Sequence, residues 1–239
     1  MWYNSMINDS GWRHIMELKD ETLSVLKNYA SINPNIVIQQ GNTIKTMTEA
    51  RNVLSSATLA EDFPQEFGIY DLNEFLGVIG LVGEPRLKFE NDYVVVTDSS
   101  NRSRVKYFYS DPEMLTTPTK DVKMPPADVS FILDQDTLGR IKRAASTLGH
   151  SELSITGKDG VLSLSVVDSQ NATSNAFSID VSGEFAGDNF NFVFNIANLK
   201  MIPGDYEVGI SSKLISHFVN KEMGIEYWIA LEKTSTFGV

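Results

Sequence analysis

The sequence contains no cysteine, which excludes disulfide bonds and thiolate chemistry from the functions open to this chain. No apolar run approaches the roughly 20 residues that a membrane-spanning helix needs. The beginning of the chain also lacks the basic and apolar segments of a secretion signal. These absences fit a protein of a reducing compartment that has no membrane partner.

Motifs for catalysis are missing as well. The sequence has no phosphate-binding loop, dinucleotide glycine pattern or nucleophile elbow. Gly77, Gly80 and Gly83 fall within or at the end of an apolar segment, where we expect them to allow close packing of a helix. The histidines show no metal-ligand spacing: His14, His150 and His217. We therefore expect no catalytic residue, no metal site and no cofactor.

The net charge of -11 argues against a general nucleic-acid binder, because such proteins are usually basic overall. Net charge describes the average field and does not exclude a local basic surface. The hydrophobic fraction of 42% is enough for one large core or two smaller ones in 239 residues.

The pattern predicts two halves joined by a connector. Residues 1–15 are expected to be an extension, with Met16 as the working start. Residues 16–110 form the first predicted domain and residues 127–239 the second. Residues 111–126 are rich in proline and lack a sustained period, which is typical of an extended connector.

Each half reads as a helix, strands, a short helix and further strands, so the fold class is α+β. In the first half the long helix has Asp20 and Glu21 in its first turn, and Asn33-Pro34-Asn35 ends it. Asp71 is placed to cap the short helix. The second half repeats this order, and its last part, from Tyr206 onward, is predicted to form two strands.

Two sequence echoes indicate that the halves are copies. An offset of 115 aligns residues 18–31 with residues 133–146 and gives six identities in fourteen positions. A weaker echo, at an offset of 124, aligns "YDLNEFL" with "FNIANLK". Because both echoes occur in the same order at similar offsets, we interpret them as a domain duplication.

The second long helix is predicted to expose positive charge. With Ile141 at the centre of its buried face, Arg143 points almost directly away, and Arg140 and Lys142 lie on the flanks. The first copy is less basic, because Val25 and Asn28 stand at the positions of Arg140 and Arg143. Two lysines complete the predicted basic surface: Lys27 on the first helix and Lys200 on the short helix of the second half.

At these residues the chain resembles a known family. "DETLSVLKNYASINPN", "IYDLNEFLGVIGLV", "FNFVFNIANLKMIPGDYEV" and "YWIALEK" are similar to segments of the DNA sliding clamps of T-even-type bacteriophages. The resemblance extends from Met16 to about Lys233 and depends on the order of packing segments. Departures are the N-terminal extension, the hairpin region from Ser212 to Gly224 and the weakly basic first helix.

The resemblance implies a homotrimeric ring with two clamp domains per protomer. Antiparallel sheets would form the outside, and helices would line a hole through which duplex DNA passes without sequence specificity. Partners would be the replicative DNA polymerase and an ATP-driven clamp loader, in the cytoplasm of an infected bacterial host. The residues expected to face DNA are Lys19, Lys27, Arg140, Lys142, Arg143 and Lys200.

The resemblance also implies two protein contacts. Edge strands of neighbouring protomers would pair, with Arg102–Tyr109 and Asn175–Ser182 as candidates. The interface residues expected from these strands are Arg104, Tyr107, Tyr109, Phe177 and Ile179. An apolar pocket near the connector would bind partner peptides through Leu115, Met124, Pro125, Trp228 and Ile229, although burial in the core is the competing interpretation of the last two.

Two other functions remain open from the residues alone. A structural virion or adhesion protein could be built from duplicated β-rich domains without a basic lining. A hydrolase could use dispersed carboxylates such as Glu66, Asp71 and Glu74, although Asp71 is explained more simply as a helix cap. The oligomeric state separates the ring from both.

Overall fold

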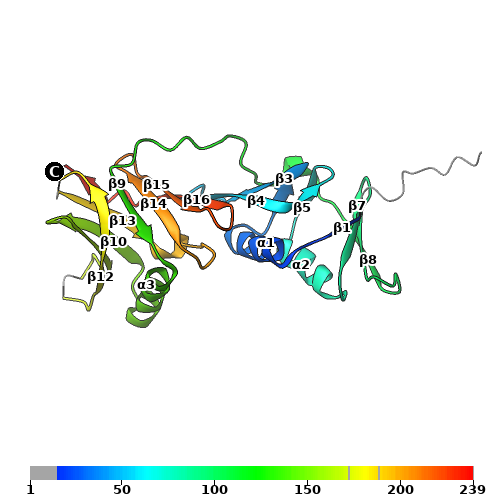
Figure 1. Ribbon diagram of the computed structural model, residues 1–239, viewed down its shortest axis with the longest axis horizontal. Coiled ribbons are helices and arrows are strands. Elements are labelled where there is room, and N and C mark those ends of the chain that lie inside the picture. The colour runs from blue at the N-terminus through cyan, green and yellow to red at the C-terminus, as the bar shows by residue number, and fades with distance from the viewer. Residues whose placement is uncertain (1–14, 172, 188, 239) are drawn as a thin grey trace, which may run out of the picture. The chain divides into compact units, whose positions relative to one another are not determined.

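The computed structural model describes residues 15–171, 173–187 and 189–238 (Figure 1). Residues 1–14 of the predicted extension lie outside this range, whereas Ile15 belongs to the first strand. The described residues fall into two compact units. Unit 1 contains residues 15–30, 34–44 and 59–116, and unit 2 contains residues 31–33, 45–58 and 117–238. Residues 45–58 therefore group with unit 2, and the predicted domain limits stay a prediction.

The order of elements is the same in the two halves of the chain. The first series is β1 (Ile15–Glu17), α1 (Asp20–Ile32), β2 (Ile36–Ile38), β3 (Gly41–Met47), β4 (Val53–Phe63), β5 (Phe67–Ile69), α2 (Leu72–Gly80), β6 (Arg86–Phe89), β7 (Tyr93–Thr97) and β8 (Arg104–Phe108). After the 3-10 turn η1 (Pro112–Met114), the second series is β9 (Val129–Leu133), α3 (Gln135–Leu148), β10 (Glu152–Lys158), β11 (Val161–Val167), β12 (Phe177–Phe185), β13 (Phe190–Asn195), η2 (Ile196–Asn198), β14 (Tyr206–Ser211), β15 (Ile215–Asn220) and β16 (Ile225–Ala230). A short strand, β17 (Thr236–Phe237), follows.

Strand pairing repeats along with the order. The antiparallel ladder β1-β6-β7-β8 of unit 1 has the same connectivity as β9-β14-β15-β16 of unit 2, and the β2–β5 pair matches the β10–β13 pair. One rung across each ladder shows the correspondence: Glu17–Arg86–Thr97–Arg104 in the first and Ile132–Glu207–Val219–Glu226 in the second. The first residues of the two rungs, Glu17 and Ile132, are 115 positions apart, which is the offset found in the sequence. The predicted duplication is therefore confirmed.

Helices α1 and α3 begin with acidic residues in the first turn, as predicted. The carboxylate of Asp134 caps α3 by accepting a hydrogen bond from the backbone N–H of Thr137 at 2.7 Å. Gly149 ends this helix at a φ of 71°, a left-handed conformation that glycine adopts without strain.

Helix α2 is capped by Asp71, whose carboxylate accepts from the N–H groups of Asn73 and Glu74 at 2.9 and 3.1 Å. Its buried side chains are Leu72, Phe75 and Ile79. The expectation of close packing at Gly77, Gly80 and Gly83 is wrong, because a Cβ atom added at any of them would meet nothing within 4 Å. These glycines instead leave the outward side of the helix bare.

Strand β12 changes its neighbour along its length. It pairs with β11 from Phe177 to Ser182, and with β9 from Gly183 to Phe185. At the change, a Cβ atom on Gly183 would lie 2.8 Å from the carbonyl oxygen of Ser130, so the backbones approach too closely for a larger residue. Each stretch of β12 therefore has one strand neighbour among the described residues.

Each unit buries its own apolar core. In unit 1 the core side chains include Leu26, Ile36, Phe67, Leu87 and Val94, all at 2% exposure or less. In unit 2 they include Ile141, Leu164, Phe192, Tyr206 and Tyr227, all at 1% or less. Burial of each such side chain favours folding by about 1.5–3 kcal/mol, which holds the helices to their sheets.

Two predictions about elements need correction. The C-terminal part from Tyr206 forms the strands β14, β15 and β16, together with β17, rather than two strands. Lys200 lies beyond η2 rather than on a short helix, since η2 ends at Asn198. The connector contains only η1 as a regular element among its described residues, as predicted from its prolines.

Candidate functional site

The outward surface of α3 carries two exposed arginines, Arg140 and Arg143. The guanidinium of Arg143 lies 3.9 Å from the carboxylate of Asp136, about two helical turns earlier, and both side chains are largely exposed. An ion pair of this kind contributes little and leaves Arg143 available to another anion. Both arginines are therefore accessible, as predicted.

Lys142 differs from its arginine neighbours. Its side chain is half-buried, and its Nζ donates to the backbone carbonyl of Met201 at 3.4 Å. Burial lowers the pKa of this lysine, because desolvation disfavours the charged form. Lys200 is also half-buried, and its Nζ donates to the carbonyl of Ser31 at 2.7 Å. These two lysines are held against backbone carbonyls of the chain.

Helix α1 presents one exposed cation, Lys27, and Lys19 is exposed just before the helix. The backbone N–H of Lys19 donates to the Glu61 carboxylate at 2.5 Å. Val25 corresponds in sequence to Arg140, but its side chain is only 3% exposed. Position 25 belongs to a buried flank of the helix, whereas position 140 is open.

A hollow of about 450 Å³ lies between α3 and the start of β12. The guanidinium carbon of Arg140 lies 5.7 Å from the centre of the Phe177 ring, which places the arginine on the wall of this hollow. The lining residues are Arg140, Arg143, Ala144, Thr147, Leu148, Ala176 and Phe177. The structure therefore brings together Arg140, predicted to contact DNA, and Phe177, predicted to contact another protomer. Sequence spacing alone gave no sign of this contact.

Among the described residues, β8 is the outermost strand of its sheet and has β7 as its one strand partner. Arg104 is exposed, while Tyr107 is half-buried against Phe75 with ring centres 5.1 Å apart. The pKa of Tyr107 is raised to about 12, first by burial and then by the nearby carboxylates of Glu74 and Asp71. Helix α2 thus places negative charge beside this edge.

Tyr109 lies beyond β8 and packs on Phe67, with ring centres 5.0 Å apart. Its ring contacts therefore face the core of unit 1 rather than the strand edge. Phe177 and Ile179 are half-buried on β12, in the stretch that has β11 as a neighbour and no strand on its other side among the described residues.

Unit 2 contains one pairing that links the two series of elements. Strand β16 pairs antiparallel with the first half of β4, from Val53 to Ala57. By position in the two series, β16 is the copy of β8 and β4 is the copy of β12. The edge that is open in β8 is therefore covered in its copy. This pairing was not predicted, because partners were considered only for Arg102–Tyr109 and Asn175–Ser182, either between protomers or within their own sheets.

The predicted peptide pocket is only partly supported by the geometry. Ile229 is 0% exposed and Leu115 is 8% exposed and packs near Gly68, so neither side chain presents a surface to a partner. Trp228 does line a hollow of about 160 Å³ beside the connector, with Lys45, Leu54, Ser56, Lys120, Asp121, Val122 and Glu226. Met124 and Pro125 are half-buried and lie outside that lining.

Trp228 is fixed in this hollow by its neighbours. It stacks on His217 with ring centres 4.7 Å apart, and His217 Nε2 lies 2.8 Å from a carboxylate oxygen of Glu226. The indole N–H of Trp228 is buried and has no hydrogen-bond partner among the described residues. A buried donor without an acceptor costs about 1–3 kcal/mol, so an acceptor that reaches this group gains a favourable contact.

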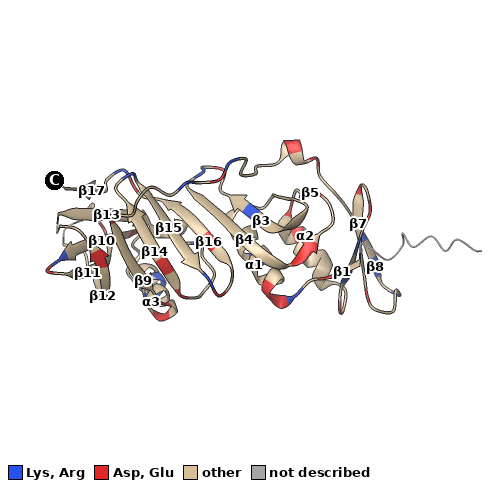
Figure 2. Cartoon of the chain, turned by 45° about the horizontal axis from the view of Figure 1, so that its top comes forward, with Lys and Arg blue, Asp and Glu red and all other residues tan. Residues whose placement is uncertain are grey.

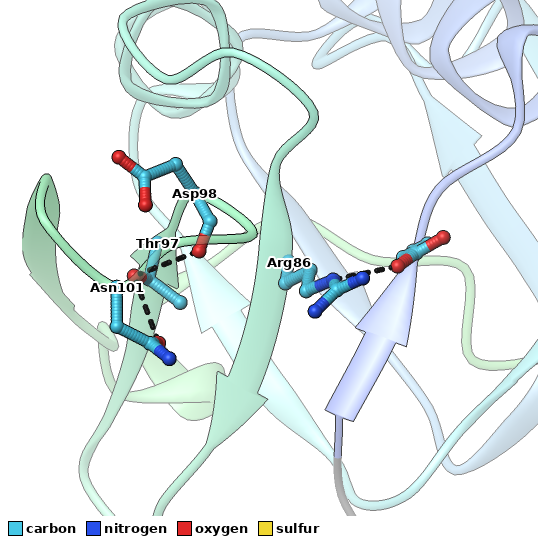
Figure 3. Close-up of polar contacts among 5 residues, drawn as sticks. Arg86, Thr97, Asp98 and Asn101 are labelled. Carbon is cyan, nitrogen blue, oxygen red and sulfur yellow. Dashed lines mark hydrogen bonds and ion pairs between the residues drawn. The ribbon is translucent and has the colours of Figure 1, made fainter.

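A second charged hollow of about 470 Å³ lies on the sheet of unit 1 (Figure 3). Arg86 donates to Glu17 at 2.7 Å, and Thr97 donates to Asn101 at 3.3 Å. Its lining also includes Ile15, Lys88, Val95 and Arg104. The corresponding rung of unit 2 has Glu207 in place of Arg86, so the two copies carry opposite charge at this place.

The structure offers no support for metal chemistry or a membrane segment in the parts it describes. Within residues 15–171, 173–187 and 189–238, no cluster of three or more histidine or carboxylate side chains is placed to hold a metal ion. No helix in these ranges is long and apolar enough to cross a membrane.

Known proteins match both halves of the chain. Residues 19–111 match the family model for a DNA polymerase processivity factor, and residues 130–233 match the model for the C-terminal part of the gp45 sliding clamp. The sliding clamp of Vibrio phage KVP40 is 32% identical over 222 residues, which cover 91% of this chain and 99% of that protein. Those of Escherichia phage RB69 and Enterobacteria phage T4 are 30% and 28% identical, each over 92% of this chain and 99% of the relative.

A solved structure matches the fold at lower identity. The crystal structure of Proliferating Cellular Nuclear Antigen from Entamoeba histolytica superimposes with a TM-score of 0.69 and 14% identity, over 92% of this chain and 98% of that one.

Proposed function

Because this chain belongs to the phage sliding-clamp family, whose members are DNA polymerase processivity factors, we propose that it forms a homotrimeric ring around duplex DNA and tethers a replicative polymerase. The ring would be placed on DNA by an ATP-driven clamp loader, in the cytoplasm of the infected bacterial host. In this proposal the chain acts as a topological tether without a catalytic step of its own.

The pairing of β16 with β4 is the observation that most supports ring assembly. It is an edge-to-edge junction between a strand of the β8 type and a strand of the β12 type. The chain has a second pair of such edges, β8 and the first half of β12, and a junction between them would join one protomer to the next. A head-to-tail contact of this kind closes into a ring when the rotation per subunit allows it.

DNA contact in this proposal comes from exposed cations on the long helices. Lys27 on α1 and Arg143 on α3 are exposed and project from the helix sides opposite their buried residues. Lys19 lies exposed before α1. Such cations make salt-dependent phosphate contacts without reading sequence, which suits a ring that has to slide. Lys142 and Lys200 would contribute less, because each is half-buried and donates to a backbone carbonyl.

For the partner peptide, we propose the hollow beside the connector that Trp228 lines. Its stacked indole offers an apolar wall to a side chain of the peptide. Lys45 and Asp121 form a salt bridge at 2.5 Å that ties the connector to β3 at this place. This proposal keeps Trp228 from the sequence prediction and leaves out Leu115 and Ile229.

Two experiments test the function. Sedimentation equilibrium should give a mass three times 26.6 kDa, and a monomer at all accessible concentrations would contradict the ring. The clamp should be loaded onto nicked circular DNA by an ATP-driven clamp loader, stay bound in high salt, and be released when the circle is cut. Retention on linear DNA with free ends would show ordinary binding rather than encirclement.

A further inference from the structure

One flank of α3 is open where the matching flank of α1 is covered. At the offset of 115, Arg140, Ala144 and Thr147 correspond to Val25, Tyr29 and Ile32. The three residues on α1 are 3%, 0% and 6% exposed. Their counterparts on α3 instead line the hollow of about 450 Å³ beside Phe177. Since the copies share one fold, the α3 flank lacks a cover that the same flank has in α1.

The junction inside unit 2 shows which element lies near that flank. Where β16 pairs with β4, the side chain of Asn198 on η2 contacts that of Asn52 at 3.2 Å, just before β4. Lys200, which follows η2, reaches the carbonyl of Ser31 near the end of α1 at 2.7 Å. At this junction η2 and the lysine that follows it therefore contact the end of α1 and the residue just before β4.

Helix α2 is the counterpart of η2 in the first series. The caps fix the alignment, because Asp71 and Asn195 each accept from the backbone N–H two residues later, at 2.9 and 3.0 Å. The same offset of 124 makes Glu74 the counterpart of Asn198. When β8 of one copy pairs with β12 of the next copy in the way that β16 pairs with β4, Glu74 of the first copy lies at the hollow between α3 and β12 of the second.

The charges of the two surfaces are opposite. Glu74 is exposed on α2. The negative charges of Glu74 and Asp71 both help to raise the pKa of Tyr107 on β8. The hollow offers Arg140 and Arg143, and Arg140 has no ion pair among the described residues. In Figure 2, where acidic residues are red and basic residues are blue, α2 carries acidic residues and α3 carries basic ones. The bare outward side of α2 at Gly77 and Gly80 allows close approach of a helix flank.

We propose that α2 of a second copy of this chain docks in the hollow between α3 and β12, where its Glu74 pairs with Arg140. The proposal rests on the ring assembly proposed above and specifies its contact. It moves Arg140 from the DNA-facing set to the protomer contact, and it leaves Arg143 and Lys27 as the exposed cations for DNA. It also explains why position 140 carries charge while position 25 is apolar, since an ion pair between copies replaces a contact within the chain.

A charge-swap experiment with the full-length chain tests this pairing. Glu74→Arg and Arg140→Glu should each raise the dissociation constant of the trimer about tenfold or more, because each places like charges together in the contact. The combined variant E74R/R140E should restore assembly to within a few-fold of the original chain. Lys158→Glu is the matched control for Arg140→Glu, since it makes the same change in net charge on an exposed position of β10 and should leave assembly unchanged. Sedimentation velocity at 50 and 500 mM salt measures all four.

Each outcome decides the question. The pairing is supported if both single variants assemble more weakly and the combined variant assembles like the original chain. It is also supported if the single variants and the original chain have similar dissociation constants at high salt, where charge interactions are screened. Single variants that assemble like the original chain overturn the pairing and leave the ring intact. Weakened single variants without restoration also overturn it. If the original chain itself stays monomeric, the ring proposal fails first, and that result is visible before any variant is made.

Discussion

Strands β8 and β16 are copies of one strand in two different situations. In the rung that relates them, Arg104 stands where the second copy has Glu226, and Lys106 stands where it has Trp228. The second edge of β16 is covered by β4, whereas the second edge of β8 has no strand beside it among the described residues. Cations on an open edge strand discourage indiscriminate pairing, and an aromatic residue suits a covered one. The comparison teaches that the copies kept their framework and differ where their edges meet different partners.

The long helices show the same division. Their centres are alike, with Leu26 and Ile141 both buried. Their flanks differ, because the Val25 side of α1 is buried and the Arg140 side of α3 is open. Their outward sides are closer in charge than the sequence indicates, since each carries one exposed cation opposite its buried face. The difference in basic residues between the copies thus reflects contacts to neighbours more than contacts to DNA.

The largest expected effect is a loss of unfolding free energy when a buried side chain of the covered strand β16 is shortened. Ile229→Ala on β16 removes a side chain that is 0% exposed and should lower the free energy of unfolding by about 2–5 kcal/mol. The matching change on β8, Tyr107→Ala, should cost the monomer less but raise the trimer dissociation constant about tenfold or more. Urea unfolding at several protein concentrations separates the two, because only assembly depends on concentration. Equal losses of monomer stability would contradict the distinction between covered and open edges.

The next effect concerns DNA. Arg143→Glu and Lys27→Glu should weaken salt-dependent DNA binding to a similar extent, because each removes the exposed cation from one long helix. The salt slope should fall by about 0.9 for each phosphate that is no longer neutralised. Reversible binding of the assembled ring to short linear duplexes, from which it can dissociate, measured from 50 to 300 mM salt, checks this. A large effect of Arg143→Glu with none for Lys27→Glu would instead restore the asymmetry that the sequence suggests.

A smaller effect separates the two lysines at equivalent positions. Lys142→Met should raise the free energy of unfolding by a few tenths to about 1 kcal/mol, because a half-buried charge is replaced by an apolar chain of similar length. Lys27→Met should stay within about 0.5 kcal/mol, since Lys27 is exposed. The pKa of Lys142 is lowered in the folded state, so the cost of its charge is full at neutral pH and is relieved as pH rises through that pKa. Urea midpoints at pH 7 and pH 10 should therefore show a benefit of Lys142→Met that shrinks at the higher pH.

Much of the fold followed from local sequence signals. The cap at Asp71, the strand–helix transitions and the proline-rich connector depend on neighbouring residues, and each was found. The duplication followed from two echoes of packing residues. Strand β1 was missed because three residues beside the long helix carry no period of their own. The strand count after Tyr206 was wrong because the turn from Ser212 to Leu214, which contains neither proline nor glycine, was interpreted as part of one continuous strand.

The candidate site was less predictable, because it depends on distant contacts. A helical wheel places Lys142 on an exposed flank, but the carbonyl of Met201, far along the chain, covers that flank. The same wheel treats Val25 and Arg140 alike, although one flank is buried and the other is open. The alternation of β16 marks Ile229 as inward, and this signal was available in the sequence and would have removed it from the peptide pocket. The alignment of "YDLNEFL" with "FNIANLK" already placed Glu74 at the position that corresponds to Asn198. Only the contact of Asn198 with Asn52 at the β16–β4 junction shows that this position lies at a strand junction.

The smallest effect is expected in the turns that lead to the two compared strands. Asp98, before β8, stands where Asn220 stands before β16, and both side chains accept hydrogen bonds from backbone N–H groups of the turn. The pKa of Asp98 is lowered to about 2, first by the hydroxyl of Ser100 and also by the N–H groups of Arg102 and Ser103. Its folded-state pKa lies below the ordinary value of about 3.9, so its contribution to stability is present above pH 4 and is lost as pH falls toward 2. Asp98→Asn gives the first turn the uncharged acceptor of the second. It should leave stability at pH 7 nearly unchanged and flatten the fall of the urea midpoint between pH 4 and pH 2. A carboxyl of Asp98 that titrates near 4 by NMR would show that the turn does not hold it as a charged acceptor, and the two turns would then differ in more than charge.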